Sequence, residues 1–185
     1  MYAETDIIKS LKQGDPLCVK MMFDNYYQAL SVYVLRYIDS FQDAEDLVQD
    51  VFISFWENKK GTRFVGSVRG YLFGSVKKAA LKFLERSGRF IFEEIENHLN
   101  SLPERLENLS EEEIRLRQHR LQKEVDRLPE KCREVFVSIV LEDMSYKEVA
   151  QKLSVSMNTV KTHYSRALKQ LREELDAIVL LLLRH

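Results

Sequence analysis

Apolar residues recur at helical spacing along most of this chain, and few helix-ending residues interrupt them. The clearest stripe consists of Leu47, Val48, Val51, Phe52 and Phe55, which share one face of a helix. Similar stripes lie within residues 71–84, 134–141 and 160–175. The 185 residues include only 6 Gly and 3 Pro, too few for the many turns that a β-rich chain needs. We therefore predict an all-α fold.

A stretch rich in carboxylates divides this helical pattern. Residues 91–113 contain eight Glu and one Arg, and acidic, weakly apolar sequence is typical of a linker. A chain of this length can form one ordinary core or two modest ones. We predict two small helical domains, at residues 1–90 and 115–185, joined by an acidic linker at residues 91–114.

Charge is sorted by segment, although the formal net charge is only −1. Residues 43–57 carry five acidic side chains and no Lys or Arg. Residues 77–89 carry five basic side chains against Glu85, and residues 157–172 carry four basic side chains and no carboxylate. One acidic helix and two basic ones indicate two kinds of partner surface.

The strongest local pattern lies within residues 141–172. Ser145 and Glu148 have the spacing of a capping box, so a short helix is expected over residues 146–153. Ser156 can cap a second helix that runs to about residue 175. Small Ala150 allows the two helices to approach closely, and Val155 is expected to fill the corner between them. This arrangement is a helix-turn-helix, whose second helix enters the major groove of DNA.

The outward face of the second helix carries side chains that can donate to phosphates and base edges. These candidates are Asn158, Thr159, Lys161, Thr162, Ser165, Arg166 and Lys169. The alternative is a basic face that is merely solvated. Because the caps, the turn, the core and the charge all agree, we favour DNA binding.

Residues 125–136, 144–153 and 156–172 are similar to the C-terminal domain of bacterial sigma factors, which reads the upstream promoter element. Helix-turn-helix response regulators share part of this pattern. Residues 23–30, 43–57 and 70–73 resemble the N-terminal sigma domain, and the string Asp-Ala-Glu-Asp-Leu-Val-Gln-Asp-Val-Phe at residues 43–52 is specific to it. Only the short acidic stretch separates the two domains, as in the small extracytoplasmic-function (ECF) type.

The resemblance implies a role for the acidic helix. In the family this helix docks on the clamp helices of the large polymerase subunit, so Glu45, Asp46, Gln49 and Asp50 are the candidate core-polymerase-binding residues. Their oxygens would accept hydrogen bonds from a basic partner helix. An ordinary acidic solvent face is the alternative that spacing alone leaves open.

A basic loop with three Gly occupies residues 58–70, and a basic helix follows it. Family members bind the non-template strand here and hold one flipped base, which requires a basic groove with aromatic walls. The candidates for downstream-promoter binding are Arg63, Phe64, Lys77, Lys78 and Lys82, with Phe64 equally well a core residue. Arg-Asn is common in the family where Lys77 and Lys78 stand. We therefore carry over no downstream sequence preference.

The resemblance implies a sigma factor that binds core RNA polymerase, recognises a two-part promoter and promotes DNA melting. It also implies control by an anti-sigma protein. The alternative is a helix-turn-helix regulator that acts on duplex DNA without polymerase. The four His show no metal-ligand spacing, and the sequence has no phosphate loop or nucleophile motif. We therefore expect no enzyme, no metal and no cofactor.

The sequence also indicates a compartment. Cys18 and Cys132 form no disulfide framework, which favours a reducing cytoplasm. No secretory signal begins the chain. The apolar run at residues 177–183 is far shorter than the roughly 20 residues that span a bilayer, so we expect no membrane insertion. The run could pack on the C-terminal domain, hold the two domains together, or dock a partner.

Overall fold

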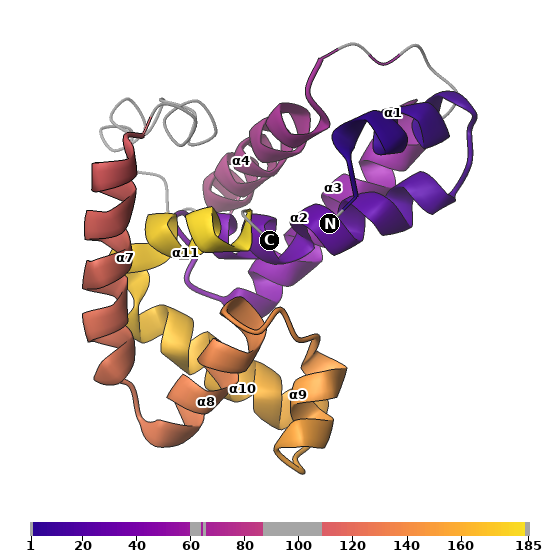
Figure 1. The fold of residues 1–185 in the computed structure, drawn as a ribbon. Coiled ribbons are helices and arrows are strands. Elements are labelled where there is room, and N and C mark those ends of the chain that lie inside the picture. Colours follow the sequence, from indigo (N-terminus) through magenta and orange to yellow (C-terminus); the bar gives the residue numbers. More distant parts are fainter. Residues whose placement is uncertain (1, 60–63, 65, 87–108, 184–185) are drawn as a thin grey trace. The chain divides into compact units, whose positions relative to one another are not determined.

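The computed structural model describes residues 2–59, 64, 66–86 and 109–183, and these residues form helices without a strand (Figure 1). The predicted all-α fold is thereby confirmed. The chain divides into two compact units, residues 1–108 (unit 1) and residues 109–185 (unit 2). No helix within the described ranges is long and apolar enough to cross a membrane.

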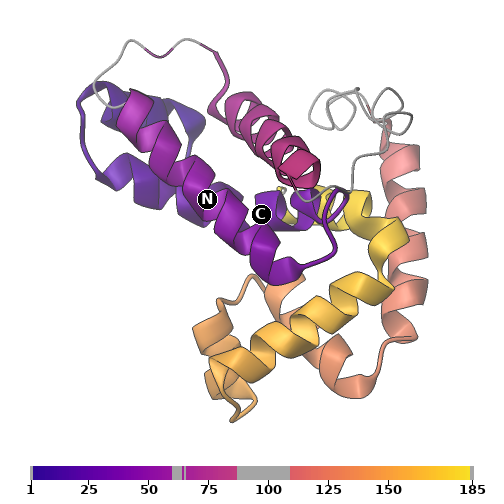
Figure 2. The same cartoon turned by 180° about the vertical axis from the view of Figure 1, so that it is seen from behind.

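Unit 1 contains four described helices: α1 (Glu4–Lys12), α2 (Leu17–Val34), α3 (Phe41–Lys59) and α4 (Val68–Arg86). Helix α2 contacts the other three, and α3 also packs along α4 (Figures 1 and 2). The large apolar side chains of these helices are buried between them. The rings of Tyr33 in α2 and Phe73 in α4 meet edge to face, with centroids 5.1 Å apart. Such pairs add to the stabilisation that burial alone provides.

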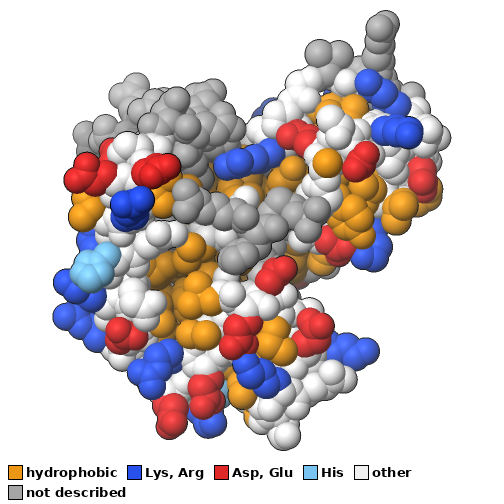
Figure 3. All heavy atoms as spheres, in the orientation of Figure 1, with side chains coloured by type: hydrophobic (Ala, Val, Ile, Leu, Met, Phe, Trp, Pro, Cys, Tyr) orange, Lys and Arg blue, Asp and Glu red, His pale blue; other side chains and the backbone are white. Residues whose placement is uncertain are grey.

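Unit 2 contains α7 (Glu111–Asp126), α8 (Glu130–Val140), α9 (Tyr146–Lys152), α10 (Met157–Gln170), a 3₁₀ turn (Arg172–Glu174) and α11 (Leu175–Leu182). Helices α8 and α10 form its centre, with Phe136, Ile139, Tyr164 and Leu168 fully buried. On the face drawn in Figure 3, acidic and basic side chains are interspersed over unit 2. Unit 2 as a whole thus carries both signs of charge, although its helix α10 carries basic side chains and no carboxylate.

The start of α7 differs from the predicted linker boundary. The predicted linker ends at residue 114, but α7 begins at Glu111, and Ser110 and Glu113 form a complete capping box. Glu111, Glu112 and Glu113 therefore belong to the first helical turn, where negative charge complements the helix dipole. The linker residues 91–108 lie outside the described part of the chain.

The second helix of the helix-turn-helix ends earlier than expected. It stops at Gln170 and not at residue 175, because Leu171 leaves helical geometry with ψ of 22°. The 3₁₀ turn then redirects the chain into α11, which contacts α7 and α8. Most of the apolar run at residues 177–183 is buried there.

Candidate nucleic-acid and protein interfaces

Helix α3 presents a row of acidic and amide side chains. Its apolar stripe, ending in Phe52 and Phe55, is buried within unit 1, against α2 and α4. The opposite face of the helix is therefore turned outward. Asp46, Gln49 and Asp50 are exposed on that face. The side chain of Gln42 donates from Nε2 to Oδ1 of Asp46 at 3.1 Å. Three of the four predicted polymerase-binding residues are thus accessible to a partner.

Glu45, the fourth predicted polymerase-binding residue, is 1% exposed. Its Oε1 accepts a hydrogen bond at 3.0 Å from the hydroxyl of Tyr27 in α2, and Gln49 donates to the same hydroxyl at 3.4 Å. Burial and the adjacent Glu45 charge raise the pKa of Tyr27 well above its usual value. The structure therefore corrects the expectation that this carboxylate faces a partner helix: it joins α3 to α2. The reason is its position three residues before buried Val48, on the apolar stripe.

Helix α4 carries a basic row. Lys78, Lys82 and Arg86 are exposed at intervals of four residues, on one helical face. Lys77 points elsewhere and is half-buried, and burial together with the nearby charge of Arg36 lowers its pKa. Of the three predicted lysines, the structure brings Lys78 and Lys82 together and separates Lys77 from them.

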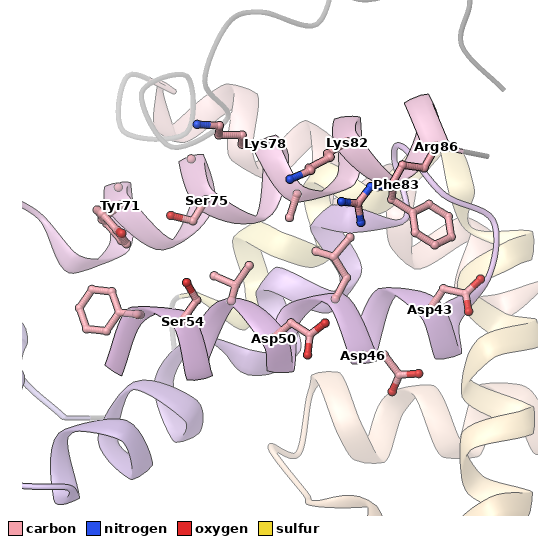
Figure 4. A pocket seen from close by; sticks show the side chains of 16 residues that line it. Asp43, Asp46, Asp50, Ser54, Tyr71, Ser75, Lys78, Lys82, Phe83 and Arg86 are labelled. Carbon is pink, nitrogen blue, oxygen red and sulfur yellow. The ribbon is translucent and has the colours of Figure 1, made fainter. Parts of the chain in front are cut away.

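The acidic row and the basic row line one groove within unit 1. This α3–α4 groove has a volume of about 1030 Å³ and an apolar floor that includes Leu47, Val51 and Phe83. Asp43, Asp46 and Asp50 lie along its α3 side, and Lys78, Lys82 and Arg86 along its α4 side (Figure 4). Among the ion pairs of the described residues, none joins the two rows. Both sets of charges are thus available to outside partners.

Aromatic rings close one end of the groove. The ring of Phe64 lies edge to face with Phe55 and Tyr71, at centroid distances of 5.8 and 5.9 Å. Tyr71 remains 37% exposed, and Nζ of Lys59 lies 5.5 Å from the centre of its ring. Phe64 therefore packs within an aromatic cluster, and Tyr71 is the more accessible ring for a base. Arg63 lies outside the described residues.

In unit 2, α9 and α10 form the predicted helix-turn-helix. Ser145 and Glu148 make both hydrogen bonds of the capping box, and Ser156 Oγ accepts from the backbone N–H of Thr159 at 3.0 Å. Ser154 in the turn has a φ of 54°, a left-handed conformation that changes the chain direction. Val155 is 38% exposed, so it does not fill the corner as expected.

The predicted DNA-reading side chains lie along α10. Asn158, Thr162, Arg166 and Lys169 are exposed, and Thr159, Lys161 and Ser165 are half-buried. The Lys161 ammonium lies 5.6 Å from the centre of the Tyr146 ring, which supports it over α9. Thr162 donates to the Asn158 carbonyl oxygen at 2.9 Å.

Beside this row, the sequence analysis did not single out Met157 and placed Val155 in the corner between the helices. Met157, 54% exposed at the first position of α10, and the exposed Val155 add an apolar patch. Their place at the entry to the recognition helix is the signal that could have found them, because the first residues of such a helix approach base edges.

His163 lies on the side of α10 that faces α8. Its Nδ1 is 3.7 Å from Sγ of buried Cys132. Within the described ranges, no three His, Cys, Asp or Glu side chains gather in a way that could hold a metal ion. The polar groups exposed in the two units suit binding to charged macromolecules.

Residues 22–90 match the family described as Sigma-70 region 2, and residues 118–171 match Sigma-70, region 4. The chain is 23% identical over 159 residues to RNA polymerase sigma factor YlaC of Bacillus subtilis, covering 85% of this chain and 91% of the relative. It is 31% identical over 137 residues to ECF RNA polymerase sigma factor SigE of Mycolicibacterium smegmatis, covering 72% of this chain and 52% of that relative. It is 23% identical over 186 residues to ECF RNA polymerase sigma-E factor of Haemophilus influenzae, covering 94% and 95%.

Proposed function

This chain belongs to the ECF-type sigma factors of RNA polymerase. We propose that its exposed charged rows bind different partners during transcription initiation, one row the core polymerase and the others promoter DNA. A sigma factor binds core polymerase and promoter DNA and is a regulator, not an enzyme. The observation that carries this division of partners is that unit 1 has an acidic and a basic row on one groove, while unit 2 has a helix-turn-helix. A helix-turn-helix alone would equally suit a regulator of duplex DNA.

The acidic row on α3 is the proposed polymerase-binding surface. Asp46, Gln49 and Asp50 offer exposed oxygens that take part in no ion pair among the described residues of unit 1. A basic helix of the polymerase clamp would supply the donors. Glu45 contributes by holding α3 on α2, since its carboxylate is buried.

The basic row on α4 is the proposed contact to the melted downstream strand. Lys78 and Lys82 would bind phosphates, and the exposed ring of Tyr71 would stack on a base. Unstacking a base step costs a few kcal/mol, and such contacts in the groove would offset it. Lys77 is half-buried and makes a smaller contribution.

Helix α10 is the proposed reader of the upstream element. Arg166 and Lys169 are exposed for phosphates or base edges, and Asn158 and Thr162 lie nearer the start of the helix. We expect Arg166→Ala to cost about 1–3 kcal/mol of binding free energy if the guanidinium reads a base. We expect Lys169→Ala to reduce the slope of log affinity against log salt by about 1 if the ammonium binds a phosphate.

Promoter opening with purified core polymerase tests the whole assignment. Opening should require both core and this protein and should select a two-part motif from a library of promoter fragments. The double variant Asp46→Asn, Asp50→Asn should bind core about tenfold more weakly, while Asp6→Asn, which removes an exposed charge from α1, should not. Equal binding to duplex DNA with and without core, and no opening, would favour the alternative of a free-standing regulator.

An anti-sigma protein is the proposed regulator. It would cover the same acidic row, because a protein that blocks polymerase docking keeps a sigma factor inactive. The double variant should then weaken both core and anti-sigma binding. Since polymerase and promoter DNA lie in the bacterial cytoplasm, we infer that this chain acts there too.

A further inference from the structure

The start of α4 is capped by a carboxylate from a distant helix. The first backbone N–H groups of an α-helix have no acceptor within the helix. Ser67 Oγ accepts from the N–H of Gly70 at 3.1 Å. The N–H groups of Val68 and Arg69 both donate to Oε1 of Glu4, in the latter case at 3.3 Å. Glu4 lies in the first turn of α1, 64 residues before Val68.

Helix α4 needs this contribution because its own first turn is poorly equipped. It has no acidic residue there, although negative charge stabilises the positive end of a helix dipole. Gly70 and Gly74 also lower its intrinsic helix propensity. Besides the local acceptor Ser67, the Glu4 carboxylate supplies an acceptor for two further amides and the negative charge that the first turn of α4 lacks.

The position of Glu4 is itself fixed. The side chain of Asn25 in α2, 5% exposed, accepts from the N–H of Tyr2 at 2.8 Å and donates to the Tyr2 carbonyl oxygen at 2.7 Å. Ile7, one turn after Glu4, is fully buried. Burial raises the pKa of neighbouring Tyr26, the Glu4 charge raises it further, and the positive charge of Arg69 acts in the opposite direction. These contacts place Glu4 at the α4 start through α2.

We propose that Glu4 is a positioning residue for capture of the downstream promoter strand. By fixing the first turn of α4, it sets where Tyr71 stands relative to Phe55 and where Lys78 and Lys82 stand along the α3–α4 groove. It also occupies two amides that would otherwise attract a phosphate, which leaves the strand's phosphates to the lysines. This role rests on the proposed function.

Amide hydrogen exchange tests the cap without reference to DNA. In Glu4→Ala, the amides of Val68 and Arg69 should exchange about fivefold to tenfold faster. Glu4→Gln keeps an acceptor oxygen and should show a smaller increase. Asp6→Ala, an exposed acidic residue on the same turn of α1, is the matched control and should show no change. Unchanged exchange in Glu4→Ala would overturn the proposal.

Three binding measurements on the full chain then test the positioning role. Glu4→Ala should weaken binding to a single-stranded downstream fragment in the presence of core, and slow promoter opening, by about fivefold. Its affinity for core and for upstream duplex should stay within about twofold of wild type, and Glu4→Gln should restore most of the opening. If Glu4→Ala lowered thermal stability and weakened binding to the downstream strand, to core and to upstream duplex by similar factors, Glu4 would have only a structural role, and the proposal would be overturned. If wild type itself opens no promoter, the proposed function fails and this role with it, while exchange still reports the cap.

Discussion

Three helices of unit 2 are capped by side chains next to their own first turns, whereas α4 of unit 1 adds to its local cap, Ser67, a carboxylate from another helix. Ser110 with Glu113 starts α7, Ser145 with Glu148 starts α9, and Ser156 starts α10, each within three residues. At α4, Glu4 serves two amides from a separate helix. A local cap lets a helix form in place, and a remote cap makes its start depend on the packing of other helices.

This difference matters for the two kinds of DNA contact. A helix-turn-helix reads a duplex that already has its final shape, so a self-contained unit suffices. In the proposed function, the downstream strand must be held after it has melted, through contacts from α4 alongside α3. The precision of that groove depends on the packing of α1 and α2 as well.

The largest effect should come from loosening α1. Ile7→Ala removes fully buried carbons and should lower the free energy of unfolding of unit 1 by about 3 kcal/mol. It should also speed exchange at Val68, because Glu4 moves with α1. Fluorescence of Trp56, the single tryptophan, during urea unfolding measures the first effect. Lys9→Ala on the exposed face of α1 is the control; a similar loss there, or an unchanged Val68 amide, would contradict the dependence of α4 on α1.

A second remote contact in unit 1 joins Tyr27 to Glu45. Tyr27→Phe leaves the buried carboxylate without this donor and should cost about 2 kcal/mol. The raised pKa of Tyr27 means that folding favours the protonated hydroxyl. The contribution of the Tyr27 hydroxyl to the free energy of unfolding is therefore fully present below the usual tyrosine pKa near 10. It is lost progressively as the pH rises from there through the raised pKa of the folded state.

Urea unfolding of wild type and Tyr27→Phe between pH 7 and 11 checks this. The difference in stability between the two proteins should shrink above about pH 10, because only the wild type loses this contribution. Tyr26→Phe measures separately the pH dependence that comes from Tyr26, a neighbouring buried tyrosine of α2 whose pKa is also raised. A stability difference that stays constant with pH would show that the hydroxyl contributes by packing alone.

These contacts also explain which features the sequence could reveal. The starts of α9 and α10 were predicted because the signals at Ser145, Glu148 and Ser156 are local. The start of α4 was expected near Tyr71 and lies at Val68, since its second capping residue is 64 positions away. Pairing between distant segments leaves no spacing that a single sequence displays.

The burial of Glu45 could have been predicted from helical spacing, and the expectation that this side chain faces a partner was wrong. Glu45 stands three residues before Val48 and seven before Phe52, on the apolar stripe of α3, so helical spacing alone places it inward. The family string drew attention to its charge instead. The donor that offsets the cost of burying this carboxylate, the Tyr27 hydroxyl, comes from another helix and could not be predicted from the sequence. Asp46 and Asp50, off the stripe, were correctly expected to be exposed.

A smaller effect is expected from removing a local cap. Ser145→Ala deletes the acceptor for the Glu148 N–H and should cost unit 2 about 1 kcal/mol. Unfolding followed by Trp56 should not change, because that residue lies in unit 1. Lys147→Ala, exposed on α9, is the matched control. Faster exchange confined to the first turn of α9 would support the local cap, and a matching change at Val68 would contradict the contrast between the units.

The smallest effect separates two kinds of local cap by their response to acid. Hydrogen bonds from the hydroxyl and then the N–H of Ser145 lower the pKa of Glu148, and those from the N–H and then the hydroxyl of Ser110 lower that of Glu113. Because folding favours these carboxylates in the charged form, their contribution is present above a pH of about 4.5 and is lost as the pH falls through the lowered pKa. Ser156 caps α10 through a hydroxyl that does not titrate. Exchange corrected for intrinsic rates should therefore show the first turns of α7 and α9 losing protection between pH 5 and 3 while that of α10 keeps it. Equal losses at all three starts would mean that acid acts on unit 2 as a whole and that the carboxylates add nothing specific to their caps.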